Sequence, residues 1–200
     1  MKKILFIIVL VGLCISCEKD DDQIESDDLS NFLESETPQF SAVLGDDDIN
    51  WEFGFETYQY GMSYIFAGDG PNDPRRILRF ILYQENGNNQ FIIQTPVYNT
   101  FSDEAVNNVF GIGPKNIGNS NDDFFISLTN NDDSYSICES DSNYQIEILK
   151  TEEIASSFDD QVFLNVWFKI EDLELNTCDP EYDKTLTNGL ILAKFTGHRF

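Results

Sequence analysis

Apolar and polar residues alternate along most of the chain from residue 39 onward. The pattern is clearest over 161–170, where Val162, Leu164, Val166, Phe168 and Ile170 fall on one face. A period of two residues is typical of a β-strand that buries one face. From this pattern we expect nine strands, at 39–44, 49–55, 58–66, 76–84, 91–95, 124–129, 144–150, 161–170 and 190–196.

Turn-forming residues separate the expected strands. Asn86-Gly87 predicts a hairpin turn, because both residue types tolerate the positive φ that such turns need. Thr187-Asn188-Gly189 predicts a turn before the last strand, Ser102 is a candidate N-cap of a short helix, and the Gly- and Asn-rich run 111–123 predicts a loop. These elements predict an all-β fold, either an antiparallel β-sandwich or a flattened barrel of about nine strands. The strand count does not choose between the two.

The first 38 residues have a different organisation. Lys2 and Lys3 precede an apolar run, Ile4–Leu13, which has the length of a secretory signal and is too short to span a bilayer. Residues 18–38 are polar and acidic, which predicts a disordered tether. The alternative is a short helical turn that would use the apolar residues Ile24, Leu29, Phe32 and Leu33.

The end of the apolar run, Ile15-Ser16-Cys17, resembles the lipobox of bacterial lipoproteins, although Cys14 stands where that motif more often has leucine. The resemblance implies that residues 1–16 are removed as a signal peptide and that Cys17 is acylated, so that lipid holds the chain to a membrane. The alternatives are an ordinary signal peptide cut nearby, an uncleaved signal anchor, or lipidation at Cys14. The division expected of the chain is a signal peptide (1–16), a lipidated cysteine with its tether (17–38) and a single β-domain (39–200).

The five residues that follow Cys17 resemble the export signal of Bacteroidota-type surface lipoproteins; they are Glu18, Lys19, Asp20, Asp21 and Asp22. This resemblance implies an outer-membrane protein that faces outward. The alternative is an acidic linker whose charge only keeps it solvated and extended.

The two ends of the β-domain are similar to those of a small uncharacterised family of β-domain lipoproteins from the same phylum. The similar residues are Phe40-Ser41-Ala42, Asn50-Trp51 and the Thr-Asn-Gly turn before a final strand that ends near a phenylalanine. This resemblance implies no activity.

Charge limits the partners that the chain can bind. The chain has 36 acidic and 12 basic residues, a formal net charge of −24. Loss of Lys2 and Lys3 with the signal peptide would leave 10 basic residues and a net charge of −26 (10 less 36). Nucleic acids and anionic lipid surfaces repel such a chain, so we expect neither as a partner.

Cys138 and Cys178 are the two cysteines left after signal removal and lipidation. In an oxidising compartment such a pair favours a disulfide, and the alternative is two separate buried thiols. A zinc site is disfavoured, because two cysteines and the distant His198 do not make the usual four ligands.

The residues for a catalytic site are not evident. His198, the single histidine, is the third residue from the end. The motifs His-Glu-x-x-His and Gly-x-Ser-x-Gly and a phosphate-binding Gly-rich loop followed by lysine do not occur. Carboxylates are abundant, but nothing singles out a pair, so we expect no enzyme.

Calcium is a better-motivated ion than zinc, because it prefers hard oxygen ligands. Its candidate ligands lie in four loops, which turn chemistry alone also explains: Asp46-Asp47-Asp48, Asp69 with Asn72 and Asp73, Asn121-Asp122-Asp123, and Asn131-Asp132-Asp133.

Aromatic residues suggest a binding surface. The candidates fall on more than one strand face and are Trp51, Tyr58, Tyr60, Tyr64, Tyr83 and Trp167. Exposed tyrosine or tryptophan suits sugar or protein binding, whereas the alternative places these rings in the core.

Taken together, these features lead us to expect a surface lipoprotein whose β-domain is a non-catalytic binding or accessory module for a glycan, a peptide or an envelope protein. The alternative is a structural lipoprotein that faces the periplasm and contacts other proteins.

Overall fold

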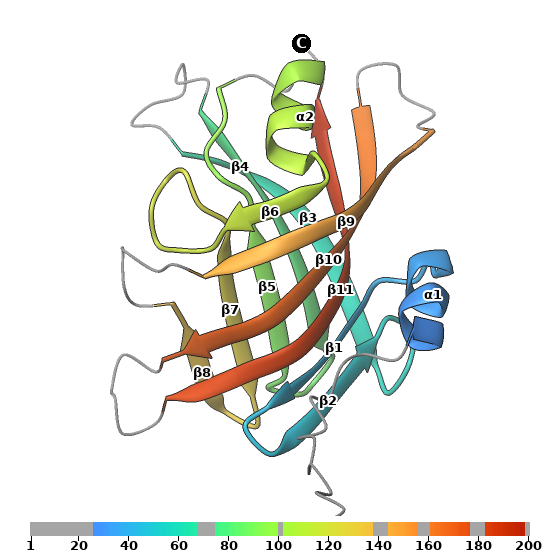
Figure 1. Ribbon diagram of the computed structural model, residues 1–200, viewed down its shortest axis with the longest axis vertical. Coiled ribbons are helices and arrows are strands. Elements are labelled where there is room, and N and C mark those ends of the chain that lie inside the picture. Colours follow the sequence, from blue (N-terminus) through green and yellow to red (C-terminus); the bar gives the residue numbers. More distant parts are fainter. Residues whose placement is uncertain are drawn as a thin grey trace, which may run out of the picture.

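Two antiparallel sheets, here called sheet A and sheet B, face each other in the computed structural model (Figure 1). The structure describes residues 26–67, 75–99, 102–137, 144–155, 161–176 and 183–198. Its elements, in chain order, are α1 (Ser26–Glu34), β1 (Gln39–Leu44), β2 (Asp47–Glu52), β3 (Tyr58–Phe66), β4 (Arg76–Gln84), β5 (Gln90–Gln94), α2 (Asp103–Phe110), β6 (Gly113–Asn116), β7 (Phe125–Asn130), β8 (Asp133–Ser136), β9 (Gln145–Ile154), β10 (Gln161–Leu175) and β11 (Lys184–His198). Neither of these two helices has the length and apolarity that crossing a membrane requires.

Sheet A has the strand order β2-β1-β11-β10-β9-β6, and sheet B has the order β3-β4-β5-β7-β8. The all-β antiparallel prediction is confirmed, and the two separate sheets make the fold a sandwich. Backbone hydrogen bonds join the sheets along one side. There the amide of Ser136 donates to the carbonyl of Asn176 (2.8 Å), and the amide of Asn176 donates back (2.9 Å).

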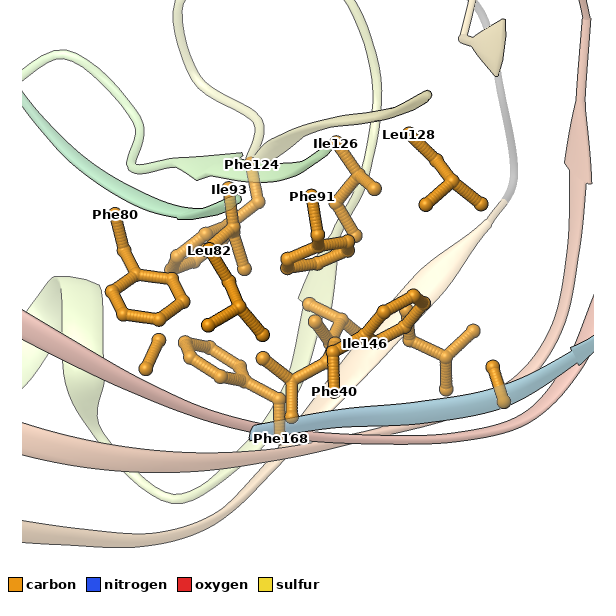
Figure 2. Close-up of a cluster of buried hydrophobic side chains, with 14 of the residues drawn as sticks. Phe40, Phe80, Leu82, Phe91, Ile93, Phe124, Ile126, Leu128, Ile146 and Phe168 are labelled. Carbon is orange, nitrogen blue, oxygen red and sulfur yellow. The ribbon is translucent and has the colours of Figure 1, made fainter. Parts of the chain in front are cut away.

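The core lies between the sheets, where the apolar face of each strand meets the other sheet. Phe80, Leu82 and Phe91 of sheet B point toward Phe40 and Phe168 of sheet A (Figure 2), and all five are fully buried. The rings of Phe40 and Phe91 stack across the core with their centroids 4.2 Å apart. The alternation of apolar and polar residues in the sequence therefore corresponds to side chains that point alternately into this core and toward the outer faces of the two sheets.

Two short strands, β6 and β8, were not predicted. β6 lies inside the Gly- and Asn-rich run that we expected to be a loop, and β8 follows β7 in a tight hairpin. That hairpin turns at Asn131 and Asp132, whose φ angles are 52° and 77°. Strands of four residues are too short for periodicity to reveal, so the described chain has eleven strands where nine were expected.

The strand predicted over 49–55 ends at Glu52. Gly54, Glu56 and Thr57 have φ angles of 83°, 46° and 69°, which break the extended conformation. Phe53 and Phe55 therefore lie in a turn and are 39% and 59% exposed, rather than on the buried face of a strand.

The turn predicted at Thr187-Asn188-Gly189 is wrong, because these residues lie inside the continuous strand β11. Asn188 has a φ of 52°, and the pairing with β1 shifts by one residue between Ser41 and Val43. The Asn-Gly pair therefore forms a β-bulge, which bends the strand without ending it.

The disordered tether predicted through residue 38 is wrong for residues 26–34, which form the helix α1 on the outer face of sheet A. Leu29, Phe32 and Leu33 follow the i, i+3, i+4 spacing of a helix face, and Phe32 is only 6% exposed. The alternative of a short helical turn is confirmed for Leu29, Phe32 and Leu33, and Ile24 lies outside the described residues.

Polar contacts fix the C-terminal end of α1 on the sheet. The indole Nε1 of Trp167 donates to the carbonyl of Phe32 (3.1 Å), and Nζ of Lys150 donates to the carbonyl of Leu33 (3.4 Å). The Lys150 ammonium also lies 4.1 Å from the centroid of the Trp167 ring. The Lys150 ammonium interacts favourably with the negative end of the helix dipole. It also donates a hydrogen bond to a carbonyl near the end of the helix, where carbonyls lack a partner within the helix.

Candidate binding face

The outward positions of the five described strands of sheet B carry no acidic residue. Side chains alternate between the two faces of a strand, and the core takes Leu78, Phe80 and Leu82 of β4 and their equivalents on the other strands. The remaining positions face outward, and we call them the acid-free face: Gln59, Gly61, Ser63, Ile65, Ile77, Arg79, Ile81, Tyr83, Gln90, Ile92, Gln94, Phe125, Ser127, Thr129, Ser134 and Ser136.

Strand register arranges this face in cross-strand rows, about 7 Å apart along the strands. One row is polar around a tyrosine and runs Gln59–Tyr83–Gln90–Thr129–Ser134. The next row is aliphatic at its centre and runs Gly61–Ile81–Ile92–Ser127–Ser136. The third row contains the arginine and runs Ser63–Arg79–Gln94–Phe125. The face thus offers apolar contact between two rows of hydrogen-bonding side chains.

Charge is distributed unequally between the two sheets. β2, β9 and β10 of sheet A carry three acidic residues each, whereas the five strands of sheet B carry only Asp133, the first residue of β8. Lysines of sheet A pair with these carboxylates: Lys150 with Glu152 (3.1 Å), Lys169 with Glu171 (2.9 Å) and Lys184 with Asp47 (3.2 Å). Sheet B therefore presents the weakly charged side of a strongly acidic protein.

Arg79 is the basic residue of the acid-free face. Its neighbours across the strands are Ser63 and Gln94, both neutral. Its Nε is buried without a hydrogen-bond partner, and within the described ranges its guanidinium has no ion pair. No carboxylate of the described residues therefore neutralises the charge of Arg79.

A hollow of about 360 Å³ opens at the end of the acid-free face, beside the polar row. Its walls come from β4, β5, β7 and the turns that follow β4 and β7, and they are formed by Tyr83, Gln84, Gly87, Asn88, Asn89, Gln90, Thr129 and Asp132. Five of these side chains are carboxamides or a hydroxyl, one is aromatic and one is a carboxylate. These side chains can donate and accept hydrogen bonds in several directions around the aromatic ring of Tyr83.

Hydrogen bonds between the two turns hold the hollow in shape. The turn after β4 begins at Asn86, whose φ is 61° as the Asn-Gly pair predicted. The Asn88 side-chain amide donates to the carboxylate of Asp132, and the side-chain Oδ1 of Asn89 accepts from the backbone amide of Asn131 (2.9 Å). The Asn89 side-chain amide also donates to the hydroxyl of Tyr58 (3.1 Å), a residue of the core. The walls are therefore positioned before a ligand arrives.

The six aromatic residues that were candidates for a binding surface lie in three kinds of position. Trp51, Tyr58 and Trp167 are buried, so the core interpretation holds for them. Tyr60 is half-buried and packs on the core, and Tyr64 is exposed at the far end of β3. Of the six, Tyr83 is the one that lies on the acid-free face and lines the hollow, with 38% of its surface exposed.

The sequence analysis did not single out Arg79 or the residues around Tyr83 as a candidate site. A signal was nevertheless present, because the strand sequences of β3, β4 and β5 contain no acidic residue in a chain that has 36. The predicted hairpin at Asn86-Gly87 joins β4 to β5, and only the strand order shows that β3 lies on the other side of β4.

The acidic loops make local contacts. Asp47 pairs with Lys184, Asp123 accepts from the hydroxyl of Ser120 (2.6 Å), and Asp132 accepts from Asn88. Within the part of the chain that the structure describes, no three His, Cys, Asp or Glu side chains are grouped to hold a metal. The predicted loop with Asp69, Asn72 and Asp73 lies outside the described residues.

The predicted N-terminal and cysteine sites also lie outside the described residues. They are the lipidation site Cys17, the export residues Glu18, Lys19, Asp20, Asp21 and Asp22, and the pair Cys138 and Cys178. Each of these therefore stays a prediction from the sequence.

Comparisons with family models, with curated proteins and with solved structures give no match for this chain. The chemistry of the acid-free face therefore carries the functional proposal.

Proposed function

We propose that the chain is an outer-membrane lipoprotein whose β-domain is a non-catalytic module that binds a glycan at the acid-free face. The observation that carries the proposal is the hollow beside Tyr83, where an exposed aromatic ring lies among carboxamide and hydroxyl groups. Sugar rings offer an apolar face that packs on an aromatic ring, and hydroxyls that pair with amides.

The position of α1 supports an outward orientation of this face. If Cys17 carries the lipid, residues 18–25 separate it from α1, which packs on the outer face of sheet A (Figure 1). Eight residues span at most about 28 Å when fully extended. The lipid would then approach the domain from the side of sheet A, and the acid-free face would lie on the opposite side of the sandwich.

The test is a glycan array probed with the mature lipoprotein in detergent, followed by affinity measurements on the ligands found. Tyr83→Ala should weaken binding at least about tenfold, which corresponds to about 1.4 kcal/mol. Tyr64→Ala is the matched control, because Tyr64 is also exposed but lies away from the face and should leave the affinity unchanged. Equal effects of the two substitutions, or no bound glycan, would refute the proposal.

A structural lipoprotein that faces the periplasm and contacts proteins is the second candidate. The half-buried Ile81 and Ile92 favour it, because the aliphatic row that they form also suits a protein surface. Protease added to intact cells separates the two candidates. A surface module predicts cleavage of the native chain and protection when Glu18–Asp22 are replaced by neutral residues, whereas a periplasmic protein is protected in both forms.

A further inference from the structure

Arg79 has no ion pair among the described residues of a strongly acidic protein. The chain has three times as many acidic residues as basic ones, and three of the five lysines of sheet A have a carboxylate partner within 3.2 Å. A structural arginine in a sheet gains most from an opposite charge directly across the strand. Arg79 instead faces Ser63 and Gln94, which leave its positive charge uncompensated while they can hydrogen-bond to a bound group.

The position of Arg79 relative to Tyr83 suits one extended ligand. The two residues are four apart on β4 and point to the same face, so they lie about 13 Å from each other along the strand. Ile81 lies between them and offers a flat apolar surface. This span exceeds a single sugar ring and matches an oligosaccharide that lies along β4.

We propose that Arg79 is an anion subsite, which binds the carboxylate of a uronic acid unit in the glycan whose other end lies at Tyr83. The guanidinium can hold a carboxylate through two parallel hydrogen bonds, and Ser63 and Gln94 can donate to the same oxygens. The inference rests on the proposed function, since it names the class of glycan for the same face.

The net charge of the protein does not prevent this contact. Charges separated by more than about 8 Å are largely screened at physiological salt. The acidic residues of sheet A lie across the sandwich, about 10 Å away or more, and the rows on either side of Arg79 contain none. An acidic glycan therefore meets a local positive charge at Arg79, although Asp132 in the wall of the hollow and the other faces of the protein repel it.

The experiment measures the affinity of the mature lipoprotein in detergent for pairs of oligosaccharides at physiological salt. Each pair consists of an oligouronide and its carboxyl-reduced, neutral counterpart, with galacturonate, glucuronate and mannuronate backbones. We expect at least one oligouronide to bind about tenfold more tightly than its neutral counterpart. Arg79→Gln should abolish that preference, and Arg79→Lys should keep part of it. Lys194→Gln is the control, because it removes a charge of sheet A that lies 6.0 Å from the Tyr60 ring and away from the face.

The outcomes separate this inference from the proposed function. If neutral oligosaccharides bind as tightly as the acidic ones, or if Arg79→Gln keeps the preference, the anion subsite is refuted while glycan binding stands. If no oligosaccharide of either kind binds, both proposals fall. Circular dichroism of Arg79→Gln, together with retained binding of the neutral counterpart, shows that the variant is folded.

Discussion

Replacement of Phe32 by alanine should release α1 from sheet A without unfolding the sandwich. Phe32 is the buried residue by which α1 joins a cluster with Trp167, Leu190 and Leu192. This cluster is separate from the core between the sheets. The substitution therefore removes the main apolar contact of the helix and leaves the larger core intact.

The favourable contributions to docking of α1 only slightly exceed the free-energy cost of starting the helix. Burial of the Phe32 ring contributes about 2 to 3 kcal/mol, and the half-buried Leu29 and Leu33 about 1 kcal/mol each. The hydrogen bond from Trp167 to the Phe32 carbonyl adds about 1 kcal/mol. Initiation of an isolated helix costs about 4 kcal/mol. Docking is thus favourable by about 1 to 2 kcal/mol, and loss of the ring makes it unfavourable by about 1 kcal/mol.

Hydrogen exchange measures this change directly. In Phe32→Ala the amides of residues 30–35, including that of Ser35, which donates to the carbonyls of Asn31 and Phe32, should exchange about five- to thirtyfold faster. The melting temperature should fall by only about 2 to 6 °C. Asn31→Ala is the control, because Asn31 is exposed on the same helix and alanine favours the helix, so this replacement should not speed exchange. Unaltered protection in Phe32→Ala would refute the idea that this side chain holds α1.

Two further predictions concern the backbone of β11 and the alkaline limit of stability. Asn188→Val should lower the free energy of unfolding by about 1 to 3 kcal/mol, because a β-branched residue is strained at a φ of 52°, whereas Asn188→Gly should be tolerated; equal melting temperatures for the two would contradict the bulge. Burial raises the pKa of Tyr98 to about 12. The native state therefore holds this proton more tightly than the unfolded state, so the contribution of Tyr98 to stability is complete below about pH 10 and is lost as the pH rises toward 12. Urea titrations between pH 9 and 12 should show that Tyr98→Phe loses less stability over this range than the native chain, and parallel losses would count against the prediction.

Most of the fold could be predicted from local pattern. The strands β3, β4, β5, β7, β9 and β10 fall where the alternation places them, and Ser102 caps α2 by accepting from the amide of Ala105. The failures occurred where a local signal has two meanings. Asn188-Gly189 has the composition of a turn, but neighbouring strands on both sides hold it extended, so that its positive φ becomes a bulge.

The helix α1 shows the same limit for an acidic segment. Composition predicts disorder over residues 18–38, and nine residues alone would not form a stable helix. The helix exists because Trp167 and Leu192 form an apolar patch on sheet A, and these residues lie more than 130 positions away in the chain.

The sequence by itself determined the strand pattern, the turn at Asn86, the cap at Ser102 and the strong negative charge. These features depend on neighbours within a few residues or on composition, which a linear chain states directly. Beyond the hairpin of β4 and β5, only the tertiary structure decided which strands lie side by side, and therefore that the face of Tyr83 and Arg79 has no carboxylate on the neighbouring strands while Trp51 and Trp167 are buried. Each strand has two faces and alternation distinguishes them, but the element that covers a face comes from a distant part of the chain.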